Sequence, residues 1–579
     1  MKKIYFVIAI AIGCLFLASC DEDKFLEEKP QDFMSATNAF ITETDFNMSV
    51  NDLYDLVRYD YYGQNEERPF DYQYGTDLCE DMQQATGRHS NMLAAYDPSG
   101  AIAKSHWENF YKVIAEANTI IDRSKTANLS DGTKTLLEAK ARFFRAFSYR
   151  TLAYLYGDVP LVLNEVTSPK FDFVRTPKAD VLNQVIEDLK FAADHLPDIT
   201  AVKDGEVSAP AALHLLSEVY LAAGKNQEAV DVATKVISNP ALHLMTVRFG
   251  SRATETPGDV YWDLFRKNNQ NRGSGNTEGI WVMQFETNLP GGGSSTADLK
   301  LRGNYMAERN FAPMIGNVTL KVNGKTLKPF RWPVSDYTGG RGIGWGAPTE
   351  HFWHEIWKSD YYNDIRNANH NFVRRFPVNN PSFTKATGID TIDVDHLPKG
   401  LVTGPGYKDS IPGRYLFPYQ TKVTTPFNHP AELIQSNGML KSIAGTTFTD
   451  QYVFRLAETY LLRAEGYLNL GDLSKAADDI NVVRSRAHAK PVQPAQVNIE
   501  YILDERMREL GFEERRRLTL CRLGKLYEHV MKYNPYYADP KRNGDGKGMQ
   551  KTYELLPIPL SFIEANKDAV IQQNPGYVN

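Results

Sequence analysis

The stretch VFRLAETYLLRAEGYLNLGDLSKAADDINVVRSRA at residues 453–487 decides the fold class. Its apolar residues recur at every third or fourth position on either side of a Leu-Gly-Asp turn, a spacing that predicts two antiparallel helices. The stretch PAALHLLSEVYLAAGKNQEAVDVATKVISNP at residues 210–240 repeats this plan, and ARFFRAFSYRTLAYLYGDVP at residues 141–160 repeats its first half. Helix pairs of this size are typical of tetratricopeptide-like units.

A long insertion separates the last of these units from the others, so we do not expect them to form one contiguous array. The insertion, about 240–450, contains Gly291-Gly292-Gly293-Ser294-Ser295, six of the seven tryptophans and one apparent short strand, EGIWVMQFE at 278–286. We predict a mostly α fold with a single domain at 40–579. Its tetratricopeptide-like scaffold, about 40–240 and 450–579, carries a large loop-rich region with short strands, where binding function usually lies.

The N-terminus has the pattern of a bacterial lipoprotein signal. Lys2 and Lys3 precede an apolar run, residues 4–17, that is too short to cross a hydrocarbon core of ~30 Å as a helix. The run ends in Leu-Ala-Ser-Cys, which predicts a signal peptide at 1–19, lipidation of Cys20 and a lipidated tether at 20–39. Two or more acyl chains would give stable anchoring. The alternative is a soluble secreted protein cleaved nearby.

Composition and motifs exclude several classes of function. The net charge of −6 and the pI of 6.1 give no footprint for nucleic acid. Cys20, Cys79 and Cys521 remain after cleavage, so the lipidated chain could form at most one disulfide, between Cys79 and Cys521, which the sequence neither predicts nor excludes. No nucleotide-binding or hydrolase motif occurs, although sequence alone neither marks nor rules out a glycosidase carboxylate pair.

Two segments resemble metal sites only superficially. HFWHEIW at 351–357 offers His351 and His354, but Lys358 stands where a zinc protease needs its second histidine. DPKRNGDGKGMQ at 539–550 lacks the acidic ligands of a calcium-binding loop at its third and last positions. We therefore predict no metal and no cofactor, while a structural calcium elsewhere stays undecided by the sequence.

Two groups of residues are candidates for ligand binding. Tyr305, Trp332, Tyr337 and Trp345 lie among Gly, Arg, Asp and Asn, where exposed aromatic planes suit the faces of pyranose rings. The loop YGTDLCEDMQQATGRHSNMLAAYD at 74–97 adds Asp77, Asp81, Arg88 and Tyr96. The alternative for the aromatic group is ordinary packing within loops. Trp353 and Trp357 are four residues apart, a helical spacing that predicts core positions.

The C-terminal stretch ILDERMRELGFEERRRLTLCRLGKL at 502–526 is dense in Glu and Arg. It could form an anion site. The interpretation that we favour is structural, with ion pairs within the helix and toward the scaffold. The residues expected in these pairs are Glu505, Arg506, Glu509, Glu513 and Arg516.

Several motifs together resemble the SusD/RagB family of surface nutrient-binding lipoproteins across essentially the whole mature chain. They are FLEEKPQD (25–32), WENFYKVIAEANTII (107–121), EAKARFFRAFSYRTLAYLYGDVPLV (138–162), the helix pair at 454–487, ILDERMRELGFEERRRLTLCRLGK (502–525) and LLPIPLSFIEANKDAVIQQNPGY (555–577). These motifs are structural in the family, so the resemblance transfers no binding residue. The proposed site therefore rests on composition and position alone.

The resemblance implies a glycan-binding protein, or in some members a peptide-binding one, that acts as a lid on a SusC-like TonB-dependent transporter and delivers ligand without catalysis. It also implies that the acidic run after Cys20 directs the chain to the surface of the outer membrane, where an enteric sorting rule would instead predict the inner membrane. The alternatives from the residues are a surface glycoside hydrolase on a helical scaffold and an oligopeptide-binding, RagB-like member. We expect no enzyme activity.

Overall fold

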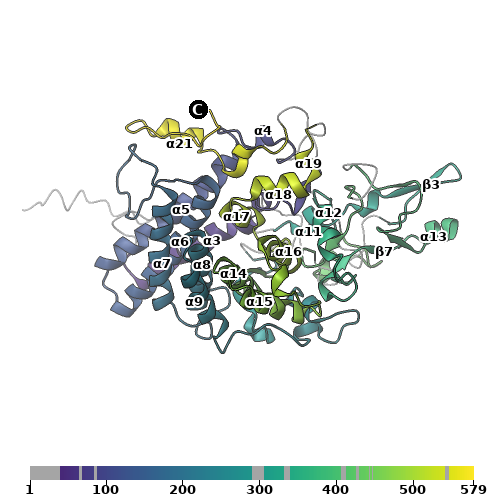
Figure 1. The fold of residues 1–579 in the computed structure, drawn as a ribbon, viewed down its shortest axis with the longest axis horizontal. Coiled ribbons are helices and arrows are strands. Elements are labelled where there is room, and N and C mark those ends of the chain that lie inside the picture. The colour runs from purple at the N-terminus through teal and green to yellow at the C-terminus, as the bar shows by residue number, and fades with distance from the viewer. Residues whose placement is uncertain are drawn as a thin grey trace, which may run out of the picture.

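The computed structural model describes residues 40–63, 68–83, 88–289, 305–331, 340–405, 412–424, 429–441, 444–445, 448–540 and 547–578. About half of the molecule is a helical scaffold and the rest is a loop-rich region with short strands (Figure 1). This agrees with the mostly α fold predicted from the sequence. Within the described ranges, no helix has both the length and the apolar character needed to cross a bilayer.

The N-terminal part of the scaffold is a series of antiparallel helices. They are α3 (Glu43–Tyr62), α5 (Ala101–Thr126), α6 (Asp131–Tyr156), α7 (Lys178–His195), α8 (Ala209–Ala222) and α9 (Asn226–Ile237). From α5 onward each helix packs against the next one in the chain. Thr42 caps α3 through a reciprocal capping box and Ser130 caps α6, so the polar residues before each apolar run set where the helices begin.

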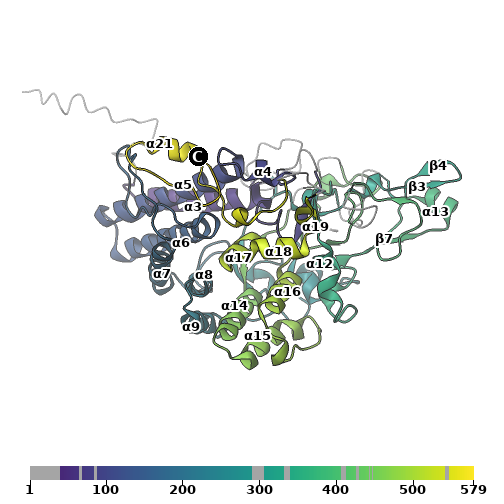
Figure 2. The same cartoon turned by 45° about the horizontal axis from the view of Figure 1, so that its top comes forward.

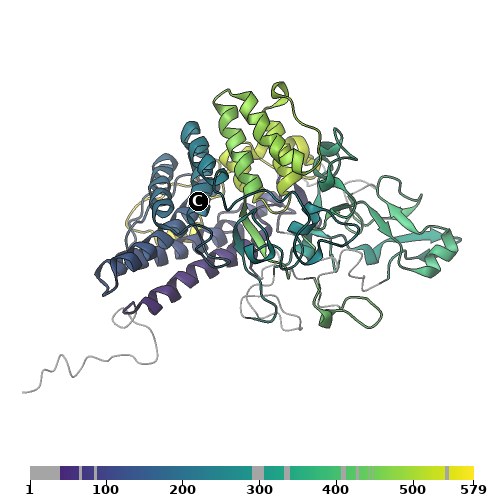
Figure 3. The ribbon, with the colours of Figure 1, turned by 90° about the horizontal axis from the view of Figure 1, so that it is seen from below.

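The second part of the scaffold continues the first in space. α14 (Leu456–Asn469) and α15 (Leu473–Arg486) form an antiparallel pair, and α14 also packs against α8 and α9, as Figure 3 shows from below. Gly466 permits this approach, because a Cβ atom there would lie 2.8 Å from Val230 Cγ2. The insertion thus separates the units along the chain, as expected, while in space α14 packs directly on α8 and α9.

The C-terminal helices close the scaffold. They are α16 (Ile499–Leu510), α17 (Arg516–Arg522), α18 (Leu526–Tyr533), α19 (Pro535–Ala538) and α21 (Leu560–Ala565). α16 packs on α14, and α17 packs on α6 (Figure 2). The chain thus returns to its N-terminal half, so motifs from both ends of the sequence lie side by side.

The insertion consists of short helices and small antiparallel sheets. Its helices are α10 (Val260–Leu264), α11 (Ala307–Phe311), α12 (Glu350–Trp353) and α13 (Pro381–Thr387), while α4 (Met92–Ala95) precedes it. The strand pairs are β2 (Gly279–Met283) with β11 (Gln451–Arg455), β6 (Phe372–Val373) with β10 (Tyr419–Gln420), and β7 (Arg375–Pro377) with β8 (Thr391–Asp393). A three-stranded sheet has the order β4 (Lys325–Leu327), β3 (Thr319–Val322), β9 (Leu401–Val402). The predicted strand at 278–286 is β2.

Among the described residues, the outer part of the insertion has a hydrophobic core that is separate from the main one. The main core includes Trp281 and Trp357, each 1% exposed, and also Trp353, so the predicted core positions of Trp353 and Trp357 are confirmed. A small core holds the outer sheets together. Its members are Met82, Ile315, Val318, Phe330, Ala347, Phe376, Ile392, Val394, Leu416, Phe417 and Tyr419.

The Glu- and Arg-rich C-terminal stretch forms buried ion pairs, as the structural interpretation predicts. Glu509 contacts the guanidinium groups of Arg366, Arg455 and Arg486, which come from other parts of the chain. Burial alone would raise the pKa of Glu509, but these three charges hold that pKa well below its ordinary value. Most partners lie on other elements, and Arg508 with Glu505 is a pair within the helix. The stretch therefore fastens the insertion to the scaffold.

Candidate functional site

The two regions predicted to bind ligand meet at one strand pair. Strand β1 (Cys79–Asp81), from the loop at 74–97, pairs antiparallel with β5 (Gly346–Pro348) of the insertion. The backbone N–H of Met82 donates to the carbonyl of Trp345 at 2.7 Å. Because Met82 also joins the small core, the N-terminal loop is fixed directly against the segment that carries Trp345. We call the accessible surface around Trp345 the candidate face.

A glycine-rich segment, 340–346, positions Trp345. A Cβ atom at Gly342 would lie 2.2 Å from the carbonyl oxygen of Ala312, and one at Gly344 would lie 2.2 Å from that of Arg414. Gly344 also has a φ of +63°, a left-handed conformation that favours glycine. The segment can therefore lie flat on its neighbours only without side chains at these positions. Trp345 itself remains half-buried, so part of its indole stays accessible.

A buried carboxylate anchors the loop that carries Arg88. Asp71 Oδ1 accepts a hydrogen bond from His89 Nε2 at 2.8 Å. Asp71 Oδ2 accepts one from Arg88 Nη2 at 2.7 Å and lies 3.1 Å from His106 Nε2. Asp60 bonds the second nitrogen of His106 at 3.0 Å. Burial lowers the pKa of His89 to about 4, so this ring is neutral near pH 7. For His106, burial opposes the charge, but Asp60 and Asp71 raise its pKa overall.

Asp77 and Asp81 lie in the interior, which corrects the expectation that they face a ligand. Asp77 is 0% exposed and pairs with Arg516 at 2.7 Å and with His529 at 2.8 Å. Asp81 is equally buried, and its carboxylate accepts from the backbone N–H groups of Gln83 and His89. Both carboxylates are satisfied within the protein, so their contribution is to shape the loop.

Tyr96 and Tyr305 are also interior residues, contrary to expectation. Tyr96 stacks on Tyr553 with ring centroids 4.6 Å apart. Tyr305 stacks on Phe70 at 5.5 Å and belongs to the main core. For Tyr305, the alternative of ordinary loop packing describes the structure better than sugar stacking does. Neither ring has a face free for a sugar.

Two predicted binding residues remain at the surface in the described part of the chain. Trp345 is half-buried, and the side chain of Arg88 is 10% exposed beside Ser105, to which it donates at 3.1 Å. Trp332 and Tyr337 lie outside the described residues, as does Cys20, so these three assignments stay predictions.

Arg414 and Tyr415 belong to the candidate face but were missed by sequence reasoning. Arg414 Nε donates to the carbonyl of Ile343 at 3.0 Å, two residues before Trp345, and both Arg414 and Tyr415 are partly exposed. Their segment, Gly413-Arg414-Tyr415, repeats the combination of Gly, Arg and an aromatic residue that marks the Trp345 segment. That composition could have identified it.

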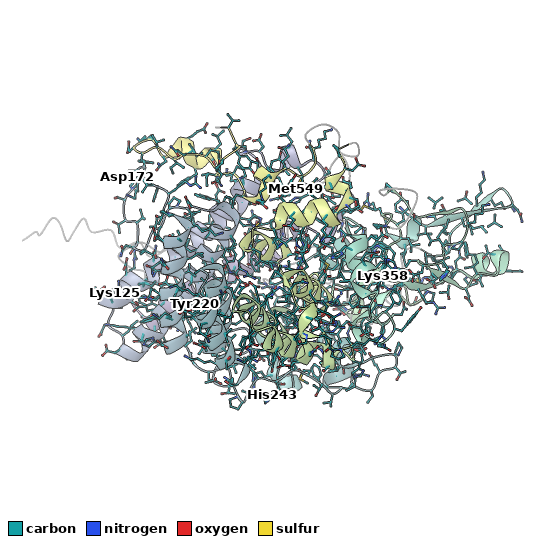
Figure 4. All side chains as sticks on the ribbon, viewed as in Figure 1. Lys125, Asp172, Tyr220, His243, Lys358 and Met549 are labelled. Atoms are coloured by element: carbon teal, nitrogen blue, oxygen red, sulfur yellow. The ribbon has the colours of Figure 1, made fainter. Side chains whose placement is uncertain are left out.

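The described residues give little support to a reactive or metal site. Glu350, His354 and Glu355 form an exposed cluster, but Glu355 already pairs with Lys358 at 2.6 Å, the residue labelled in Figure 4. Burial raises the pKa of Cys521 to about 11 and that of Cys79 well above its ordinary value, so neither thiol is activated. Both cysteines are free, which resolves the open question of whether they pair.

The sequence was compared with family models and with known proteins. A family model described as "SusD family" matches residues 277–577, and one described as "Starch-binding associating with outer membrane" matches residues 24–221. A SusD-like protein of Formosa agariphila is 26% identical, and the alignment covers 98% of this chain and 97% of that protein. The starch-binding protein SusD of Bacteroides thetaiotaomicron is 37% identical over 145 residues, which cover 25% of this chain and 24% of that protein.

Solved structures show the same fold. A laminarin binding SusD-like protein aligns with a TM-score of 0.64 and 21% identity, covering 92% of this chain and 99% of that chain. A SusD homolog from Bacteroides thetaiotaomicron aligns with a TM-score of 0.66 and 18% identity, covering 95% of this chain and 100% of that chain. At this level of identity, the likeness concerns the arrangement of the chain and not its ligand.

Proposed function

The chain belongs to the SusD family, and from this membership we propose that it captures an oligosaccharide at the cell surface and delivers it to a SusC-like TonB-dependent transporter without catalysis. The candidate face supports the binding step most directly. There, the β1–β5 pair fixes the segment that carries Trp345, and Arg414 lies against the same segment through its bond to the carbonyl of Ile343. An indole face beside a guanidinium group suits the apolar face and the hydroxyl groups of a sugar ring.

The setting of Trp345 favours a binding site that releases its ligand. The indole lies half-buried on a glycine-rich segment, so a sugar can stack on it without entering a deep cavity. One stacking contact is worth on the order of 1 kcal/mol beyond the buried area. A shallow face of this kind gives modest affinity, which a protein that passes its ligand inward requires.

The charges near the candidate face support binding rather than hydrolysis. Inverting and retaining glycosidases need a carboxylic acid that is protonated near neutral pH. Asp71 and Asp77 are two of the buried carboxylates in and beside the loop at 74–97, and burial alone would raise the pKa of each. Arg88 with two histidines overrides burial at Asp71, and Arg516 with His529 does so at Asp77, so that both pKa values lie below the ordinary range. Neither carboxylate is suited to act as the acid.

The anchoring part of the proposal rests on the N-terminal sequence. Residues 1–19 are a signal peptide, Cys20 carries the lipid, and residues 20–39 connect it to a single domain at 40–579. The acidic run after Cys20 directs the lipoprotein to the outer surface of the outer membrane. Mass spectrometry of the N-terminal peptide from membranes, together with protease accessibility on intact cells, tests both statements.

Affinity electrophoresis with product analysis tests the central proposal. Laminarin and starch lead the polysaccharide panel because the named relatives bind them. Retardation of the protein without new reducing ends supports capture without chemistry, whereas released oligosaccharides would establish the glycoside hydrolase alternative. Retention by an oligopeptide library with no retardation on any glycan would instead establish a RagB-like, peptide-binding role. Copurification with a SusC-like transporter tests the delivery step.

A further inference from the structure

A groove with apolar walls runs along α5, a helix that is distant in sequence from Trp345. It encloses about 660 Å³ between α5, the segment 160–174 and α21. Its walls include Trp107, Tyr111, Val162, Phe173 and Phe562, and the side chains of Lys104 and Lys112 stand at its edge. Apolar side chains of the segment 160–174 are open to solvent, with Val166 at the groove 50% exposed and Val174 beyond it 63% exposed. Asp172, labelled in Figure 4, belongs to the same segment.

A groove and neighbouring patch of this character generally mark a place that another segment or molecule covers. The groove itself is lined by aromatic side chains that contact one another, with the rings of Tyr111 and Phe562 stacked. Lys112 has no ion pair within the described residues, and Lys104 has only a loose one, 3.6 Å from Glu108. The occupant should therefore combine apolar side chains with negative charge.

The first described residues place the N-terminal segment next to this groove. The guanidinium group of Arg123, near the end of α5, lies over the ring of Phe40 at 5.0 Å. Arg123 Nε also bonds both carboxylate oxygens of Glu165, at 3.0 and 3.2 Å. Glu165 stands between Asn164 and Val166, which line the groove. The chain that precedes Phe40 therefore arrives at one end of the groove.

We infer that residues 32–39 cover the groove and that Phe33 and Met34 fill it. Trp107 precedes Arg123 by 16 residues of α5, which is about 24 Å at the helical rise. Phe33 precedes Phe40 by seven residues, which span roughly 23–25 Å when extended. The reach of the segment thus matches the distance to the far aromatic wall, whereas Phe25 and Leu26 would extend past it.

The charge of the N-terminal segment and the range of residues matched by a family model support the same occupant. Residues 21–32 contain six acidic and two basic side chains, which complements Lys104 and Lys112 at the edge of the groove. The family model at residues 24–221 spans this segment together with α5 and the segment 160–174. A second groove, of about 740 Å³ beside α3, is also close to the N-terminus, but Asn47, Asn51, Asp55 and Arg58 make its walls polar. It does not suit Phe33 and Met34.

Docking of this segment shortens the connection to the membrane. If residues 32–39 lie in the groove, only residues 20–31 separate the lipid from the folded body. Twelve residues reach at most about 40 Å, against about 66 Å for twenty. The body would then be held close to the membrane, with α5 and α21 facing the point of attachment.

Hydrogen–deuterium exchange on the unlipidated mature chain, residues 21–579, tests this inference. The test variant carries Phe33→Asp and Met34→Asp, and the matched control carries Phe25→Asp and Leu26→Asp in the same segment. We expect exchange in 160–174 and 560–565 to be roughly tenfold faster in the test variant and unchanged in the control. Glycan retardation should stay the same in both, so this inference and the proposed function can fail independently.

Three results would overturn the inference. Equal exchange in the test variant and the unmodified chain would leave the groove without this occupant. Protection that increases with protein concentration, together with dimers in sedimentation, would assign the groove to a second copy. Protection that appears only when vesicles of phosphatidylethanolamine and phosphatidylglycerol are added would assign it to the membrane. An unchanged melting temperature in both variants confirms that the fold is intact.

Discussion

The scaffold interior and the candidate face use the same residue types in opposite ways. In the interior, Trp281 is surrounded by aromatic rings, and each arginine around Glu509 finds a carboxylate. At the candidate face, Trp345 rests on glycines and keeps part of its surface exposed. The difference teaches that an aromatic or charged residue becomes available for binding where its neighbours have no side chains to cover it.

The largest expected effect is the loss of a buried carboxylate from the scaffold. Glu509→Ala leaves Arg366, Arg455 and Arg486 without a shared partner, and removal of one member of a buried ionic cluster costs about 3–5 kcal/mol. We expect denaturant unfolding to show a loss of this size. Glu355→Gln is the control, because its pair with Lys358 is exposed and worth at most about 1 kcal/mol. Equal losses in the two variants would contradict the contrast between interior and surface.

Two tryptophan substitutions sharpen the comparison. Trp281→Ala should cost about 3–5 kcal/mol of unfolding free energy, because a large buried side chain is removed from the main core. Trp345→Ala should cost about 1 kcal/mol or less and should reduce retardation on the bound glycan by roughly tenfold. Trp332→Ala is expected to behave like Trp345→Ala. If Trp345→Ala destabilises the protein as much as Trp281→Ala does, the candidate face is part of the core.

Gly344→Ala tests whether the glycine segment sets the position of Trp345. The φ of +63° and the carbonyl of Arg414 both oppose a side chain there, so we expect a loss of about 1–3 kcal/mol and weaker glycan retardation. Gly388→Ala is a control with a similar φ but open space around it, and it lies away from the face. It should lose stability and keep glycan binding. Normal binding by Gly344→Ala would mean that the segment tolerates movement.

The effect that is smallest for each experimental step is a pH dependence from His89, which accumulates over a window of pH values. Burial lowers the pKa of His89 from an ordinary value of 6.5 to about 4, so between these pH values the unfolded chain binds a proton that the native state does not. The free energy of unfolding should therefore fall as pH decreases through this window, by up to about 1.4 kcal/mol per unit from this group. His89→Gln can still donate to Asp71 and should reduce the slope. An identical slope in the variant would assign the dependence to other groups.

The periodicity of apolar residues in the sequence was sufficient to predict the helix pairs of the scaffold. It was insufficient to predict which residues lie at the candidate face. The apolar spacing around Gly471 and Gly224 predicted the helix pairs because each pair is decided by neighbours within one turn. Asp77 looked like a ligand-binding residue because its partner, Arg516, lies 439 residues further along the chain. A polar loop that binds sugar and one that binds a distant arginine have the same composition, so only the fold distinguishes them.

The same limit applies to the contact between the two parts of the scaffold. Nothing in the sequence around Gly466 reveals that Val230 will lie against it, because the contact depends on where the insertion returns the chain. The partial exposure of Trp345 has a local signal, since glycine stands on both sides of it, and its role in binding stays a prediction. The pairing of β1 with β5, which fixes the loop at 74–97 against the Trp345 segment, was not predictable from either segment alone.

The pairing of β2 with β11 has a consequence for how such chains diversify. Gly279 stands opposite Arg455, so the polypeptide leaves the scaffold and rejoins it at almost the same point. The outer lobe with β3, β7 and α13 projects away from that junction (Figure 1) and is held by its own small core. Because lengthening a closed loop costs little free energy, we expect insertions in this lobe to leave the scaffold stable. Evolution or protein engineering could therefore change the residues that this lobe exposes, and with them the ligand specificity, while the scaffold stays the same.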